Sequence, residues 1–274
     1  HTAYRRQRQM CIRDSNNILN GTVGSLNPFS TQQQSELKQF WEKAKPGDKL
    51  GLLTSIYKSS AGNANASRDM INSIAGESGS YRLSASLNNR GLQDIAGQIV
   101  TGQDLIEKGL VKVDETGLTK HTETYLAGIT SPGKPDFQIY LDSIKANYAY
   151  LVQKAEKVTD TKGNILNKTI DEELFNRAAK NVTGGKFTSG GFFGSKSVVL
   201  RPHTVGEKAF REQLESFNSR NARNYGGSDK DFFLDLPLEQ DPKNPYVYYF
   251  KNGSKYIMDA TDKKRQTRLT FKVR

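Results

Sequence analysis

The chain has 274 residues, enough for one large or two modest domains, and only 35% of them are apolar. Its formal net charge of +11 fits contacts with anionic partners. Cys11 is the one cysteine and no apolar run approaches the length of a membrane span, so we predict no disulfide framework, thiolate metal site or spanning helix.

Residues 1–15 (HTAYRRQRQMCIRDS) differ from the rest of the chain because they show no apolar periodicity. They resemble translated sequencing-adapter read-through, and we exclude them from the fold prediction. Since they hold four arginines and one aspartate, the remaining chain carries a net charge of +8. We expect that the natural N-terminus is missing and that the chain is the C-terminal part of a longer protein.

A series of short helices is predicted for the first half of the chain. Ser30 and Gln33 have the spacing of a capping box, in which each side chain accepts from the other residue's backbone N–H. Further helices are predicted to begin at Asp48 and Ser67, and another spans roughly 92–110. The first helix is expected to bury Leu37, Phe40, Trp41 and Ala44. The helix predicted over 92–110 contains Gly97, Gly102 and Gly109, each of which lowers helix stability by roughly 1 kcal/mol relative to alanine.

The clearest helical pattern lies between Phe137 and Gly185, after a firm break at 131–135 (SPGKP). Apolar and aromatic residues recur there at spacings of three and four: Phe137, Tyr140, Leu141, Ile144, Tyr148, Leu151, Val152 and Ala155. Thr169 is expected to open a second helix, with Glu172 at capping-box spacing. Gly184 and Gly185 are expected to end it, because glycine readily adopts the left-handed conformation.

The last part of the chain changes from helices to strands. An irregular hairpin is predicted over 186–200, and Thr204 with Glu207 is expected to cap a further helix. Three strands are predicted after it, the first two joined by the turn Asn252-Gly253: 246–250, 255–258 and 268–273. The fold class is therefore mainly α, a short-helix array and a helical hairpin with a small C-terminal antiparallel β element.

Four segments are expected from these patterns. They are a non-native or flexible N-terminal segment (1–29), a short-helix region (30–131), a region with the helical hairpin, a glycine-rich loop and a third helix (132–228), and a C-terminal β-hairpin element with a basic tail (229–274).

One hypothesis makes the chain an enzyme. Soluble lytic transglycosylases place a catalytic glutamate at a helix end in a Glu-Ser-Gly-like motif, which Glu77-Ser78-Gly79 resembles. A glutamate held in an apolar groove keeps its proton and can protonate a glycosidic oxygen. The family's following Gly-Leu-Met-Gln segment is replaced by Gly91-Leu92-Gln93-Asp94, and Arg82 and Arg90 can hold Glu77 ionised.

A second hypothesis concerns nucleic acid. The C-terminal tail carries six basic residues: Lys263, Lys264, Arg265, Arg268, Lys272 and Arg274. Tyrosines of the preceding hairpin lie near them in sequence, and basic residues beside aromatic ones can bind phosphates and stack on bases. The alternative is an ordinary sheet whose lysines protect an edge strand.

The leading hypothesis comes from a resemblance. Four parts of the chain resemble the C-terminal region of large bacteriophage internal virion proteins. These parts are 96–103 (AGQIVTGQ), 144–150 (IKANYAY), 170–175 with 182–185, and 199–202 (VLRP) with Phe210 and the terminal hairpin. Proteins of this family are often fused upstream to a lytic transglycosylase. In the family a Trp-Gly pair usually follows the proline, where this chain has His203-Thr204.

The resemblance implies a non-catalytic structural protein of the virion. No cofactor, metal or small-molecule ligand is predicted. Its implied partners are other virion proteins, with DNA or the bacterial envelope as further contacts during genome ejection. It also assigns the segment around Glu77 to the helical series rather than to a transglycosylase groove.

Overall fold

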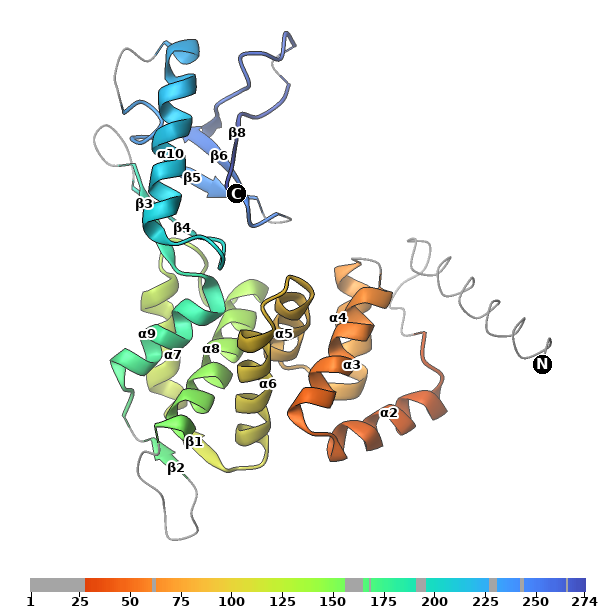
Figure 1. Ribbon diagram of the computed structural model, residues 1–274. Coiled ribbons are helices and arrows are strands. Elements are labelled where there is room, and N and C mark those ends of the chain that lie inside the picture. The colour runs from red at the N-terminus through yellow and green to blue at the C-terminus, as the bar shows by residue number, and fades with distance from the viewer. Residues whose placement is uncertain are drawn as a thin grey trace, which may run out of the picture. The chain divides into compact units, whose positions relative to one another are not determined.

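The computed structural model describes residues 28–60, 63–155, 165–167, 169–190, 196–226, 231–241, 244–264 and 266–274 (Figure 1). Most of the predicted segment 1–29 therefore lies outside the described residues. The chain divides into two compact units, which we call the helical unit (1–119 and 138–175) and the sheet unit (120–137 and 176–274). The mainly α fold class with a small C-terminal antiparallel sheet is confirmed, while the four-segment division stays a prediction.

The helical unit contains most of the helices. They are α2 (Thr31–Lys43), α3 (Pro46–Ser59), α4 (Ala64–Ala75), α5 (Gly79–Asn89), α6 (Gln93–Glu107) and most of α8 (Pro135–Lys154). A short parallel ladder joins β1 (Val111–Val113) to β2 (Ile165–Asn167). The helices α7 (Glu115–Leu126) and α9 (Glu172–Thr183) contribute residues to both units.

The predicted helix starts are correct at one position and wrong at others. The Ser30–Gln33 capping box is present in both directions. The helix expected from Ser67 begins three residues earlier, because the Asn63 side chain accepts from the N–H groups of residues 65 and 66. The helix α3 begins at Pro46 rather than Asp48, with proline in its favoured first-turn position.

The core of the helical unit is built around close helix contacts. The Trp41 ring meets Tyr81 edge to face, with ring centroids 4.8 Å apart. The helices α6 and α8 approach so closely at Gly102 that an added Cβ would lie 1.7 Å from the Ala146 carbonyl oxygen. The buried Asn147 amide donates to Gln98 Oε1 at 3.2 Å. Phe40, predicted to be buried with Trp41, is instead 46% exposed.

A buried ion cluster lies in the same unit. Lys49 Nζ donates to Asp104 Oδ1 at 2.6 Å, and Lys108 Nζ donates to Asp104 Oδ2 at 2.6 Å. Lys49 is only 3% exposed, and its ammonium also lies 5.0 Å from the Trp41 ring centroid. Burial acts to raise the pKa of Asp104, but the hydrogen bonds from Lys108 and Lys49 outweigh it, so the pKa is lowered.

The start of α9 was predicted two residues too early. Asp171, not Thr169, caps this helix, because its Oδ1 accepts from the Leu174 N–H at 3.1 Å. The Asp171 N–H in turn donates to the Tyr148 hydroxyl at 2.9 Å, which ties the cap to α8. The predicted glycine end is confirmed, with φ values of 81° at Gly184 and 98° at Gly185.

The sheet unit combines two small sheets with one long helix. The hairpin predicted over 186–200 is confirmed as β3 (Lys186–Ser189) paired with β4 (Ser197–Leu200). The second sheet holds β5 (Leu238–Gln240), β6 (Val247–Asn252), β7 (Lys255–Tyr256) and β8 (Thr270–Lys272), with β6 pairing antiparallel to the other three. The three C-terminal strands agree with prediction, whereas β5 was missed.

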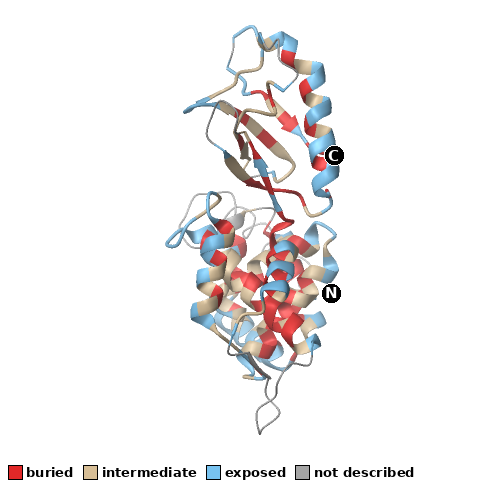
Figure 2. Ribbon diagram, turned by 90° about the vertical axis from the view of Figure 1, so that its left-hand side faces the viewer, coloured by how far each residue is buried: buried red, intermediate tan, exposed pale blue. Residues whose placement is uncertain are grey.

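Helix α10 (Glu207–Asn221) covers one face of this sheet. Phe210, Leu214 and Asn218 form its buried stripe (Figure 2), and Phe210 lies 5.1 Å from Tyr248 and 5.6 Å from Phe271 between ring centroids. The predicted Thr204 cap is wrong, because Gly206 occupies the N-cap position, without a side-chain bond to α10. The inward face of the sheet is therefore the core of this unit.

Candidate functional site

Glu77 lies on the turn between α4 and α5. Gly76 ends α4 with φ 83°, and the Ser78 hydroxyl caps α5 by accepting from the Ser80 N–H. The Glu77 side chain between them is exposed. An exposed glutamate on a turn does not have the apolar groove position that the transglycosylase hypothesis requires, so the geometry gives no support to a general-acid role.

The residues next to Glu77 make hydrogen bonds and close packing contacts between α5 and α8. The Gly79 N–H donates to Asp142 Oδ2 at 2.7 Å, and an added Cβ on Gly79 would lie 2.6 Å from the Ile139 Cα. Burial is the main cause that lowers the pKa of Arg82, with the charge of Arg68 acting in the same direction. The Ser-Gly pair after Glu77 thus fits a helix start packed against α8.

The basic C-terminal tail is arranged by strand alternation. Leu269, Phe271 and Val273 are buried in the core of the sheet unit, whereas Arg268, Lys272 and Arg274 are exposed. Successive side chains of a strand point to opposite faces, so these three cations share the outward face. The pairing of Val247 with Lys272 and of Tyr249 with Thr270 places β6 residues on the same face.

The Arg268 guanidinium lies near two tyrosine rings of that face. Its guanidinium carbon lies 3.8 Å from the Tyr256 ring centroid and 5.4 Å from the Tyr249 centroid. Lys251, opposite Tyr256 in the β6–β7 register, lies 5.1 Å from the same ring. The exposed guanidinium therefore makes cation–π contacts with the tyrosine rings.

Two carboxylates fix the tyrosine rings. The Tyr256 hydroxyl donates to Glu239 at 2.6 Å, and the Tyr249 hydroxyl donates to Asp241. These hydrogen bonds raise the pKa of both tyrosines. Burial acts to raise the pKa of Glu239, but the hydrogen bonds from Lys251 and Tyr256 outweigh it and lower the pKa.

We call Glu239, Tyr249, Lys251, Tyr256, Arg268 and Lys272 the outer sheet face. Arg268 and Lys272 are among the six predicted cations and the tyrosines belong to the predicted hairpin, whereas Glu239 is not predicted because it lies on β5. Lys263 and Lys264 lie in the loop between β7 and β8, and Arg265 lies outside the described residues. Of the six tail cations, Lys272 lies on β8, Arg268 lies just before it in a bridge to Met258, and Arg274 lies just after it; all three are exposed.

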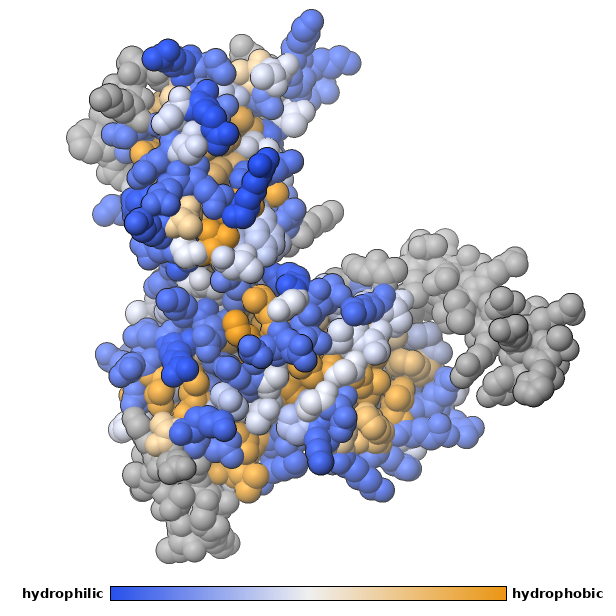
Figure 3. Space-filling model, in the orientation of Figure 1, coloured by the Kyte–Doolittle hydropathy of each residue, from blue (hydrophilic) through white to orange (hydrophobic). Residues whose placement is uncertain are grey.

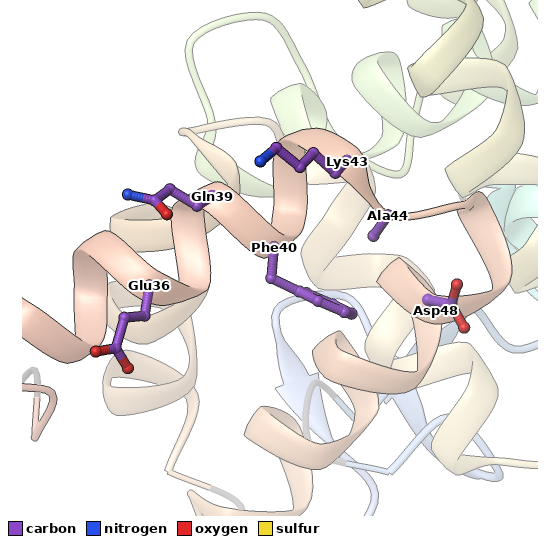
Figure 4. Close-up of a pocket in the computed structure, with 6 residues that line it drawn as sticks. All are labelled: Glu36, Gln39, Phe40, Lys43, Ala44 and Asp48. Atoms are coloured by element: carbon purple, nitrogen blue, oxygen red, sulfur yellow. The ribbon is translucent and has the colours of Figure 1, made fainter.

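A second feature lies at the surface of the helical unit. Figure 3 shows hydrophobic side chains among hydrophilic ones on this unit, and Phe40 and Leu110 are large apolar residues that are each 46% exposed. Phe40 belongs to an open pocket lined by Glu36, Gln39, Phe40, Lys43, Ala44 and Asp48. Its ring extends from α2 toward the start of α3 (Figure 4). The pocket offers an aromatic surface with charges of both signs around it.

Within the ranges given above, no group of three or more His, Cys, Asp and Glu side chains could hold a metal ion. In the same ranges, no helix combines the length and the apolar character needed to cross a bilayer. Comparison with family models, with curated proteins and with solved structures found no significant match to this chain.

Proposed function

We propose that the chain is a non-catalytic structural component of a phage virion, an internal or tail-associated protein that acts through protein–protein contacts. The proposal rests first on the resemblance of segments such as 144–150 and 199–202 to internal virion proteins. Its partners would be other virion proteins, with DNA or the bacterial envelope contacted during ejection.

The exposed Phe40 pocket is the structural observation that carries this proposal. Aromatic side chains are enriched in protein–protein interfaces, where they supply large buried areas and a few of them dominate the binding energy. Phe40 is held on a capped helix, since Trp41 beside it is anchored against Tyr81 in the core. A partner that buried Phe40 would thus meet an aromatic group carried by an anchored helix.

The proposal is tested by locating the protein. Virus particles are purified from the source whose DNA encodes this sequence, by nuclease treatment and density banding. The purified particles are then digested with trypsin and analysed for peptides of this chain. We expect these peptides to band with capsid protein and to resist protease until the particles are opened. Peptides recovered only from cell fractions, and never from banded particles, would contradict a virion role.

A second experiment addresses the transglycosylase alternative. The full chain and its Glu77→Gln variant are incubated with purified peptidoglycan, and soluble muropeptides are measured. We expect none above background from either protein, since Glu77 is exposed on a turn. Release by the wild type that Glu77→Gln abolishes would make this chain an enzyme and overturn the non-catalytic proposal.

A further inference from the structure

We propose that the outer sheet face binds single-stranded nucleic acid, with Arg268 as its central contact. This inference stands on the geometry of the sheet unit and does not depend on the virion role. Its ligand is a polyanion with exposed bases.

Arg268 is preorganised for this task. Its guanidinium lies 3.8 Å from the Tyr256 ring centroid, and the tyrosine is itself held through its hydroxyl by Glu239. A flat guanidinium keeps its N–H groups in the plane, where they can donate to phosphate oxygens, and it offers a planar surface on which a base can stack. Little side-chain freedom is then lost on binding.

The charges around Arg268 complement a sugar–phosphate strand. Arg268, Lys272 and Arg274 alternate with buried residues over 268–274, a segment that contains β8. Outward positions two residues apart are about 6.6 Å apart, so Arg268 and Lys272, with Thr270 between them, are about 13 Å apart. Among the described residues, no carboxylate forms an ion pair with any of these three cations. The Glu239 carboxylate forms its direct ion pair with Lys251, although Arg268 also lies close enough to help lower the pKa of Glu239. The face therefore keeps positive charge for phosphates, with that of Arg268 partly offset by Glu239.

The same face is poorly suited to a membrane surface. Binding to anionic lipid needs a dense cluster of basic residues or an apolar helix face that enters the acyl boundary. Here Thr270 separates Arg268 from Lys272, and the aromatic residues Tyr249 and Tyr256 have their hydroxyls bound to carboxylates. Stacking rings beside spaced cations are typical of single-strand binding sites.

The test uses the full chain and a fluorescently labelled 20-nucleotide oligo-dT, with binding followed by anisotropy at 50 and 200 mM salt. We expect binding that weakens with salt, and Arg268→Gln is expected to bind about tenfold more weakly. Lys272→Gln, an exposed position without a stacked partner, is expected to bind about threefold more weakly. Arg268→Lys should fall between wild type and Arg268→Gln, because it keeps the charge and loses the planar group.

Lys208→Gln is the matched control. It removes the same charge from α10, on the opposite side of the sheet-unit core, and the Lys208 side chain is 91% exposed. Its affinity should equal that of wild type. Three results would each overturn the proposal. The first is no binding of wild type to oligo-dT at 50 mM salt, and the second is an equal loss of affinity in Lys208→Gln and Arg268→Gln. The third is binding to anionic phosphatidylserine vesicles but not to oligo-dT. Circular dichroism of each variant confirms that the fold is intact.

Discussion

Replacement of Gly102 by alanine tests the packing of α6 on α8. In an unconstrained helix interior the change would stabilise the protein by about 1 kcal/mol, since glycine is a poor helix former. Here the added Cβ would lie 1.7 Å from the Ala146 carbonyl oxygen and 2.7 Å from its carbon. Both are backbone atoms of a helix, so neither can rotate away as a side chain could.

The cost follows from this geometry. A carbon and a carbonyl oxygen approach to about 3.3 Å in close helix contacts, so the two helices must separate by roughly 1.6 Å. Overpacking of this kind costs about 1–3 kcal/mol or more. After the gain in helix propensity, Gly102→Ala should destabilise the helical unit by up to about 2 kcal/mol.

Gly97→Ala supplies the control on the same helix. An added Cβ at Gly97 has no neighbour within 4 Å, so this variant should be more stable than wild type by about 1 kcal/mol. Urea unfolding is followed by the fluorescence of Trp41, the one tryptophan of the chain, which lies in the helical unit and therefore reports on that unit. If Gly102→Ala proves as stable as Gly97→Ala, the close contact is refuted.

Three further predictions concern single interactions. Asp104→Asn leaves the buried Lys49 without a carboxylate and should cost about 3–5 kcal/mol. Because the pKa of Asp104 is lowered in the folded protein, its stabilising contribution is present above the ordinary value of 3.8 and is lost as the pH falls through the lowered pKa. The urea midpoints of wild type and variant should therefore converge as the pH is lowered below that pKa. Asp171→Ala should lower the Trp41-monitored stability by about 1 kcal/mol, whereas Thr169→Ala should leave it unchanged, and the reverse order would contradict the observed cap. Gly253→Ala places a side chain at φ 58° and should destabilise the hairpin by about 1 kcal/mol, measured as faster hydrogen exchange of the Ile257 amide, which donates to the Phe250 carbonyl.

Local patterns predicted much of the helical content but misplaced several helix ends. Ser67 and Asn63 are both good capping residues, and only the folded backbone shows that the Asn63 side chain accepts the first N–H groups. Helix α5 was missed for a different reason. Its buried face includes Ser80 and Ser84, which periodicity treats as polar, although Ser84 satisfies its hydroxyl on the Ser80 carbonyl at 2.8 Å.

The glycines of α6 show the limit of propensity arguments. Gly97 and Gly102 are equivalent in the sequence, and both were predicted to weaken the helix. The structure separates them, because only Gly102 lies against the backbone of α8, 44 positions further along the chain at Ala146. A contact of that sequence separation leaves no local signal.

The alternation of side chains along a strand makes part of the outer sheet face predictable from sequence, whereas the contacts between strands are not. Period-2 alternation places Arg268 and Lys272 on one face from their positions alone. Their neighbours depend on register, and a shift of one residue in the β6–β8 pairing would turn Tyr249 into the core and Tyr248 outward. The Tyr248 hydroxyl opposes such a shift, since it donates to the buried Leu200 carbonyl at 2.6 Å. The inward tyrosine thus fixes the register that brings Tyr249 and Tyr256 beneath Arg268.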